Sequence, residues 1–251
     1  MAVAPRGSRY AFAMGTRNGI IIGQSSPVLQ WPDRFPSTET ADMAFLDLAF
    51  GPQDGHVVYG GTRQGLLSSL DARTNATEPI ALRHAGPISK VLPLRSVGAH
   101  GTEILLAGPL HKMAIYDTRF KRVARPRSQP HSKRGRLRDK FANSHVPVVQ
   151  FPEFCNEAHT SFGIDFDLKL GVVAASHDDG RIGIHSLRTG RSLRHDKGID
   201  VGCDSPVKAV QFARAVHDLN NSLWVGAGAF TYRFNVGSEL NFDTPEVICH
   251  S

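Results

Sequence analysis

The residues in this chain that most suggest chemistry are His177, Asp178 and Asp179, which stand side by side just before Gly180. Histidine and carboxylate groups can hold a metal ion or transfer protons, but a metal site needs ligands that converge from fixed directions. Adjacent side chains in a tight turn point apart. Because Asp and Gly tolerate the positive φ of hairpin turns, the run predicts a structural turn formed by Asp179 and Gly180.

Common catalytic motifs are missing from the sequence. It contains no Gly-x-Ser-x-Gly nucleophile elbow, no Gly-x-x-x-x-Gly-Lys phosphate loop and no His-Glu-x-x-His zinc motif. Its three cysteines, Cys155, Cys203 and Cys249, are scattered and form neither a Cys-x-x-Cys metal motif nor a disulfide framework. The sequence therefore predicts a protein that is not an enzyme and that holds neither a metal nor a cofactor.

The composition is that of a globular protein. The chain has 251 residues, 41% of them hydrophobic, which suffices for a sizeable core. No apolar run approaches the length of about 18 residues that a membrane helix needs, and the N-terminus lacks the apolar stretch of a secretory signal. We expect no membrane association, and a location in the nucleus, the cytoplasm or both.

Most of the positive charge lies in one segment. The net charge is +6, and ten of the 22 residues from 119 to 140 are Lys or Arg. The segment is interrupted by prolines and poor in apolar residues, so we predict a disordered basic insertion at 121–145. Its basic residues include Lys121, Arg122, Arg125, Arg127, Lys133, Arg134, Arg136 and Arg138. They could form a solvated loop, bind phosphate groups or act as a nuclear import signal around 132–138.

A pattern of β-hairpins recurs along the chain. Each copy has a short apolar run that ends in small residues, then a polar turn, then alternating apolar positions. The copies cover 9–25, 56–74, 103–121, 171–190 and 221–236. The turn residues Gly19, Gly65 and His111 follow one another at equal intervals, and the longer interval from His111 to Gly180 contains the basic segment. That segment is thus predicted to be an insertion in a regular array.

Further short segments complete each repeat. Alternating stretches at 44–50, 87–94, 161–167 and 206–212 would supply an inner strand, and those at 78–84 and 191–195 would suit an outer strand. Four strands in a unit of roughly 40 to 45 residues is the pattern of a β-propeller blade. The sequence therefore predicts an all-β propeller with about five recognisable blades, in a single domain over 1–251. Five blades also predict an incomplete ring, unless the terminal segments close it in another way.

The repeat resembles the WD40 repeat. In the stretch GVVAASHDDGRIGIHSLRTG, His185-Ser186 stands where Trp-Asp usually ends the third strand of a blade. Tyr116-Asp117 and Leu70-Asp71 occupy the same place in two earlier copies, and His84 stands where a WD40 repeat has the histidine that helps to hold the blade together. The resemblance covers about 41–236 and implies a WD40-type β-propeller.

The order of the blade variants is similar to the C-terminal half of the cullin-4-associated factor 4 group (WD repeat protein 21). These proteins are intracellular substrate receptors of a cullin-RING ubiquitin ligase. The succession here is YGGTRQG with LDAR, HAGPISKV with IYDTR, LGVVAASHDDGRIGIHSLRTG, and a short LWVGAGAFTYRF ending. This resemblance implies a protein-interaction scaffold whose partners are the cullin-4 adaptor and a substrate protein.

The resemblance also implies where the adaptor binds. In that group the adaptor contacts a Trp-Asp-x-Arg end of the third strand in two neighbouring blades. The matching residues here are Asp71 with Arg73 and Asp117 with Arg119. The implied adaptor-binding set also includes Arg188, although Ser186 stands in place of its aspartate. The alternative interpretation is that each aspartate bonds nearby backbone and each arginine is a solvated surface charge.

A competing hypothesis is a nuclear or nucleic-acid-associated scaffold that acts through the basic segment. No aromatic residue lies between Phe120 and Phe141, so the stacking platform of a single-strand binder is missing. Deleting residues 122–140 would spare adaptor binding under the first hypothesis and abolish partner binding under the second.

Overall fold

The computed structural model describes most of the chain, and all the regular secondary structure that it describes is β-strand. The described residues are 1–4, 10–16, 19–24, 33–36, 44–52, 55–73, 76–94, 103–119, 145–193, 199–202, 207–214, 222–235 and 246–249. They include no helix, and therefore no helix of a length and polarity that could cross a membrane. The predicted all-β class is confirmed.

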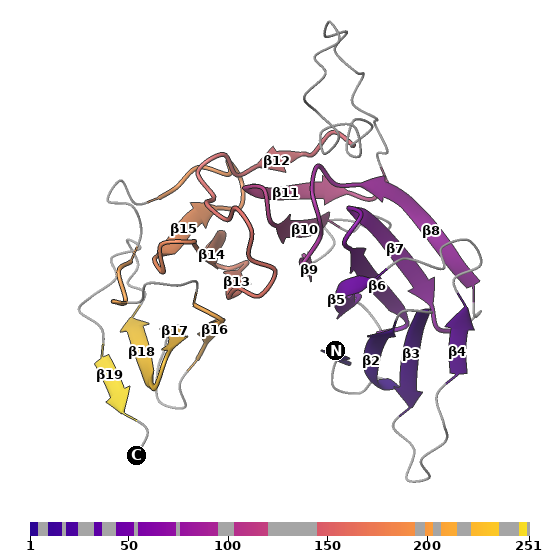
Figure 1. Ribbon diagram of the computed structural model, residues 1–251, viewed down its shortest axis with the longest axis horizontal. Coiled ribbons are helices and arrows are strands. Elements are labelled where there is room, and N and C mark those ends of the chain that lie inside the picture. Colours follow the sequence, from indigo (N-terminus) through magenta and orange to yellow (C-terminus); the bar gives the residue numbers. More distant parts are fainter. Residues whose placement is uncertain are drawn as a thin grey trace, which may run out of the picture. The chain divides into compact units, whose positions relative to one another are not determined.

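The chain divides into two compact units, Met1–Val148 and Val149–Ser251 (Figure 1). The first unit contains β1 (Ala2–Val3), β2 (Tyr10–Thr16), β3 (Gly19–Gln24), β4 (Asp33–Pro36), β5 (Phe45–Phe50), β6 (Val57–Thr62), β7 (Leu66–Asp71), β8 (Ala76–Arg83), β9 (Lys90–Pro93), β10 (Glu103–Gly108) and β11 (Lys112–Asp117). The second contains β12 (Val149–Gln150), β13 (Ile164–Asp167), β14 (Val172–Ser176), β15 (Ile182–Ser186), β16 (Ala209–Ala213), β17 (Ser222–Ala227), β18 (Phe230–Asn235) and β19 (Glu246–Cys249). The expectation of one domain over 1–251 stays a prediction.

The described strands form five small antiparallel sheets, each made of strands that are consecutive in sequence. In the first unit the neighbours are β1-β2-β3-β4, β5-β6-β7-β8 and β11-β10-β9, and in the second they are β13-β14-β15 and β16-β17-β18-β19. Successive antiparallel strands joined by short turns are what a propeller blade requires. The prediction of about five blades is therefore confirmed.

The hairpins share one register. Asp71 pairs with Val57, Asp117 with Glu103, and Ser186 with Val172, so in each case the last residue of the third strand faces the first residue of the second. The residue before it, Leu70, Tyr116 or His185, is buried in every copy. The three repeats that align in sequence therefore also have the same strand pairing.

Apolar residues from neighbouring sheets pack together within the first unit. One cluster joins β2 and β3 to the sheet β5 to β8, with Ala13, Ile20, Ile22, Leu48, Phe50, Val58, Leu70 and Ala72. A second cluster joins that sheet to β9, β10 and β11, with Tyr59, Leu67, Leu82, Ile88, Val91, Ile104, Leu106, Ala114 and Tyr116. Because side chains alternate across a strand, consecutive residues such as Val58 and Tyr59 serve different clusters.

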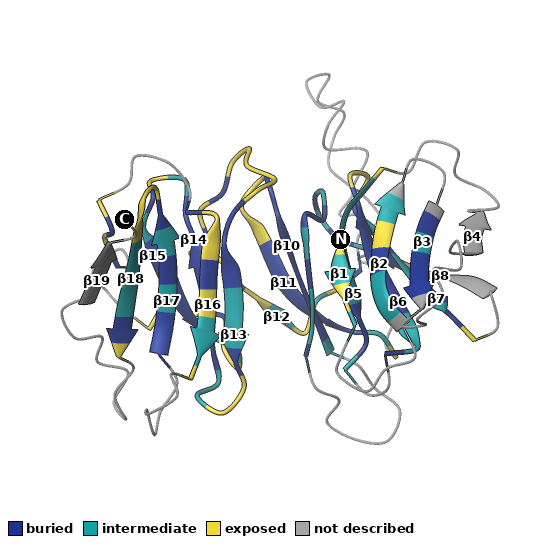
Figure 2. Ribbon diagram, turned by 90° about the horizontal axis from the view of Figure 1, so that it is seen from below, coloured by how far each residue is buried: buried dark blue, intermediate teal, exposed yellow. Residues whose placement is uncertain are grey.

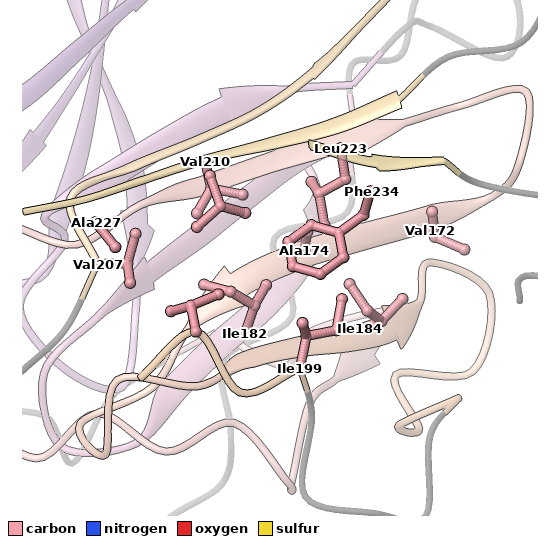
Figure 3. Close-up of a cluster of buried hydrophobic side chains, with 12 residues drawn as sticks. Val172, Ala174, Ile182, Ile184, Ile199, Val207, Val210, Leu223, Ala227 and Phe234 are labelled. Atoms are coloured by element: carbon pink, nitrogen blue, oxygen red, sulfur yellow. The ribbon is translucent and has the colours of Figure 1, made fainter. Parts of the chain in front are cut away.

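The second unit follows the same rule (Figure 3). Val172, Ala174, Ile182 and Ile184 of the hairpin β14–β15 pack against Val207, Val210, Leu223, Ala227 and Phe234. Leu223 has no exposed surface, and neither does Ile182. Each sheet is thus stabilised by the apolar face of its neighbour in the same unit, at roughly 25 cal/mol for every Å² removed from water.

Strands β10 and β14, in the middle of their sheets, are buried on both faces (Figure 2). All residues of β10 after Glu103 are buried, and so are all five residues of β14. A strand between two sheets shows a continuous apolar run where a half-exposed strand would alternate. This explains the runs ILLAG and VVAA in the sequence.

The predicted basic insertion at 121–145 lies outside the described residues, except for its last residue. His145 is buried, and its Nδ1 accepts a hydrogen bond of 2.9 Å from the backbone N–H of Arg83. The backbone N–H of His145 donates to the Arg83 carbonyl at 2.8 Å. His145 is therefore held against the end of β8.

Candidate functional site

An aspartate and an arginine form a closed pair at the end of β7. Oδ1 of Asp71 accepts hydrogen bonds from the backbone N–H of Arg73 at 2.9 Å and from its Nε at 3.0 Å. Nη2 of Arg73 donates to Oδ2 at 2.7 Å. An aspartate bonding the backbone two residues on is a common turn, and the two-pronged contact is the geometry that a guanidinium offers a carboxylate. The arginine thus folds back onto the end of its own strand.

The end of β11 repeats this arrangement. Asp117 Oδ1 accepts from the Arg119 backbone N–H at 2.9 Å and from Nε at 3.0 Å, while Nη2 of Arg119 donates to Oδ2 at 2.7 Å. We call Asp71 with Arg73, and Asp117 with Arg119, the two Asp-Arg pairs. The same hydrogen bonds therefore recur at the end of the third strand in two consecutive sheets.

The arginines of the pairs are exposed, whereas the aspartates are more protected. The side chains of Arg73 and Arg119 are 58% and 45% exposed, against 28% and 8% for Asp71 and Asp117. The hydrogen bond to the arginine lowers the pKa of each aspartate, so both carboxylates are charged at neutral pH. Each pair therefore holds an exposed, permanently charged guanidinium in one orientation.

The third copy keeps the turn but lacks the ion pair. Ser186 Oγ accepts hydrogen bonds from the backbone N–H groups of Arg188 and Thr189, both at 3.3 Å. Arg188 is exposed, and no acidic side chain of the described residues lies within ion-pair distance of it. The hydroxyl replaces the aspartate as backbone acceptor and cannot orient the arginine.

A buried polar contact lies inside the sheet, beside the second Asp-Arg pair. Nδ1 of His84 and the hydroxyl of Tyr116 are 2.9 Å apart, and the two rings meet edge to face with centroids 5.6 Å apart. Burial lowers the pKa of His84 to about 4 and raises that of Tyr116, so both groups are neutral. The histidine that the WD40 resemblance marks therefore contacts the residue in the tryptophan place.

The predicted turn residues lie at hairpin ends. Gly65 and Gly180 have φ of 75° and 78°, a region that glycine enters without strain. Gly19 is the first residue of β3 and pairs with Thr16, and residues 17–18 lie outside the described part of the chain. In the β10–β11 turn, two non-glycine residues have positive φ: Leu110 at 66° and His111 at 55°.

The run at 177–180 forms a turn between β14 and β15. Asp179 Oδ1 accepts from the backbone N–H of Arg181 at 3.1 Å, and Asp178 Oδ2 accepts from the backbone N–H of Glu157 at 2.6 Å. The two aspartates thus bond different segments. Within the described ranges, no three His, Cys, Asp or Glu residues are grouped so that they could hold a metal ion.

The basic residues of the predicted insertion have no described position. Lys121, Arg122, Arg125, Arg127, Lys133, Arg134, Arg136 and Arg138 all lie outside the described residues. The nucleic-acid hypothesis rests on them alone and stays a prediction from sequence.

Sequence reasoning missed two aspartates that join neighbouring inner strands. Asp47 of β5 accepts a hydrogen bond of 2.8 Å from the backbone N–H of Val91 in β9, and Asp165 of β13 accepts one of 2.7 Å from Phe212 in β16. Burial raises the pKa of both carboxyl groups. A signal was present in the sequence, because each aspartate stands between two apolar residues of an inner strand, in LDL and IDF.

Comparison with known proteins gives a fold and no family. No protein-family model matches the chain, and no curated protein matches it. Among solved structures, the chain is similar to one in the crystal structure of the mitotic checkpoint complex, a WD40 propeller protein, with a TM-score of 0.56 at 14% identity. It is also similar to the computationally designed Ika8 protein, with a TM-score of 0.52 at 17% identity.

The matches extend over most of this chain and about half of the others. They cover 90% of the chain and 58% of the checkpoint protein, and 89% of the chain and 54% of Ika8. At such identities the likeness concerns the fold alone. Together with the five antiparallel sheets, it shows a β-propeller type of fold.

Proposed function

We propose that this β-propeller chain is a non-enzymatic protein-interaction scaffold. Its more specific role is that of a substrate-receptor-like subunit of a cullin-4 RING ubiquitin ligase, located in the nucleus, the cytoplasm or both. Because a fold alone does not define a function, the proposal must come from the residues at the ends of the strands.

The repeated Asp-Arg pair is the observation that carries the proposal. Two arginines at the same place in consecutive sheets of one unit each have their Nε–Nη2 edge fixed by an aspartate. An ion pair between exposed groups adds little stability, about 0 to 1 kcal/mol, so folding alone gives weak reason to repeat it. An arginine held in one rotamer loses less side-chain entropy on binding, which suits it to a protein interface.

The partner chemistry follows from the group that is presented. A preorganised guanidinium donates hydrogen bonds to carboxylates and backbone carbonyls, and it stacks on aromatic rings. Arginine is also enriched among the residues that dominate interface energies. This agrees with the adaptor contact implied by the resemblance of LDAR and IYDTR to the Trp-Asp-x-Arg ends of receptor blades.

The variant that tests this proposal removes both guanidinium groups. We expect Arg73→Ala with Arg119→Ala to weaken binding of the purified chain to the cullin-4 adaptor at least about 100-fold, since an arginine that is an interface hot spot contributes about 2 kcal/mol or more. The measurement is the equilibrium Kd by biolayer interferometry. Loss of an exposed side chain should leave the unfolding midpoint nearly unchanged.

A charge-matched control lies at the other end of the same hairpins. Arg63 and Lys112 are exposed residues next to the β6–β7 and β10–β11 turns. Arg63→Ala with Lys112→Ala removes the same net charge and should bind like the wild type. Equal Kd values for both double variants would contradict the proposal. A chain that lacks 122–140 should also keep its affinity, and loss of all partner binding there would favour the basic-segment hypothesis instead.

A further inference from the structure

Two histidine rings lie side by side inside the hairpin β14–β15. The centroids of His177 and His185 are 5.7 Å apart with an interplanar angle of 33°. His177 is 9% exposed and His185 is fully buried. Gly183 makes room for them, because a Cβ there would overlap Nε2 of His177 and lie 2.7 Å from Nε2 of His185. We call His177 and His185 the histidine pair.

The histidine pair is enclosed by aromatic rings. Phe151 contacts His185 edge to face at 5.9 Å, and Phe154 contacts His177 in the same way at 5.9 Å. Phe162 packs behind Phe154 at 5.7 Å. Among the described residues, Nε2 of His177 and both ring nitrogens of His185 have no hydrogen-bond partner. A positive charge on His185 would be buried without compensation, which is strongly unfavourable.

The two turn aspartates act on His177, against the effect of burial. Asp179 and Asp178 favour its protonated form, but burial has the larger effect and lowers the pKa of His177. Both carboxylates also have other partners: Arg181 Nε lies 3.9 Å from Asp179 Oδ2, and His159 Nε2 lies 3.7 Å from Asp178 Oδ1.

His185 faces no described acid, and the nearby thiol adds no charge. Burial, and then the neighbouring His177, lower the pKa of His185 to about 4. Cys155 lies near the two turn aspartates, and burial raises the pKa of its thiol, so it stays neutral. Protonating one ring of the pair also disfavours protonating the other.

The end of the hairpin beside the pair is tied to the next sheet of the unit. Ser176 Oγ accepts a hydrogen bond of 2.7 Å from the backbone N–H of Val207, and the N–H of Gly163 donates to the Val207 carbonyl at 2.6 Å. The N–H of Ser176 in turn donates to the Gly163 carbonyl at 2.9 Å. The residue just before His177 therefore makes the contact that joins the two sheets.

We propose that the histidine pair is an acid-sensitive latch, which keeps the hairpin β14–β15 and its tie to Val207 closed while both rings are neutral. When the hairpin opens, His185 regains an ordinary pKa near 6.5. The open form then binds protons more readily than the closed form. The closed form is at its most stable above pH 6.5, and that stability is lost as the pH falls from 6.5 toward 4.

Hydrogen exchange on the full chain measures the opening directly. Residues 172–186 should open about thirtyfold more often at pH 5.0 than at pH 7.5, after correction for intrinsic rates, from the shift of His185 alone. His185→Phe removes the titrating group and keeps an aromatic ring in the pocket, so its opening should be nearly the same at both pH values. His185→Leu also removes the titrating group and provides a second variant should the larger ring disturb folding.

A control variant separates the latch from general acid effects. His159 is half exposed and lies outside the aromatic pocket, so His159→Gln should retain the rise of the wild type. The latch is refuted if wild-type residues 172–186 open equally at both pH values. It is equally refuted if His185→Phe and His185→Leu both show the full wild-type rise.

Discussion

The turn between β10 and β11 stores strain that a substitution can release. Leu110 and His111 both have positive φ, whereas the corresponding turns use Gly65, Gly180 and Gly228. A left-handed conformation costs an ordinary residue about 1 to 2 kcal/mol. Two adjacent residues of positive φ define the hairpin turn in which Asn-Gly is preferred.

We expect Leu110→Asn with His111→Gly to stabilise the protein by about 1 to 2 kcal/mol. The relief of about 2 to 3 kcal/mol at two positions is offset by about 0.5 to 1 kcal/mol for the greater chain entropy of glycine in the unfolded state. The Leu110 side chain is 41% exposed, so its loss removes only part of a buried contact.

Urea unfolding followed by circular dichroism measures this change as a shift of the midpoint at constant slope. Gly65→Ala is the reverse control, because it forces a Cβ into a turn with φ of 75° and should destabilise by about 1 kcal/mol. A double variant that is no more stable than the wild type would show that the β10–β11 turn holds no releasable strain.

Three further changes test the packing and the buried histidine of the first unit. Tyr116→Phe removes the hydroxyl beside Nδ1 of His84 and should lower the free energy of unfolding by about 1 to 3 kcal/mol. Urea titration measures this change, and an unchanged midpoint would contradict it. Because burial lowers the pKa of His84 to about 4, wild type should lose about 3 kcal/mol between pH 7 and pH 4 through this group, and His84→Phe should remove that part of the acid sensitivity. Gly61→Ala would place a Cβ against Cγ2 of Ile88 and should lower the free energy of unfolding by about 1 to 3 kcal/mol. Gly226→Ala, with its nearest contact at 3.1 Å, should lower it less. Equal thermal midpoints for the two variants would argue against tight packing at Gly61.

The hairpins could be predicted from sequence because their information is local. Turn residues and alternation within a few positions determine the register, so the sequence alone aligns Asp71, Asp117 and Ser186 correctly. The same spacing placed His111 where Gly65 stands in the previous copy, and the structure gives His111 the positive φ of such a position.

The contacts between segments could not be predicted in the same way. Asp47 bonds Val91, which is 44 residues away, and that bond depends on how two sheets pack. The interaction of His177 with His185 depends on the turn between them and on the aromatic rings that cover them. Likewise, sequence placed each arginine two residues after its aspartate, but only the side-chain conformation reveals that Arg73 folds back onto Asp71.

The central proposal is that the ends of β7 and β11 bind the cullin-4 adaptor. The most direct measurement is hydrogen exchange of the full chain with and without that adaptor. We predict slower exchange at the backbone amides of 71–73 and 117–119, with 63–65 and 110–112 at the opposite hairpin ends unchanged. Protection at the opposite ends, or none at either Asp-Arg pair under saturating adaptor, would contradict the proposal.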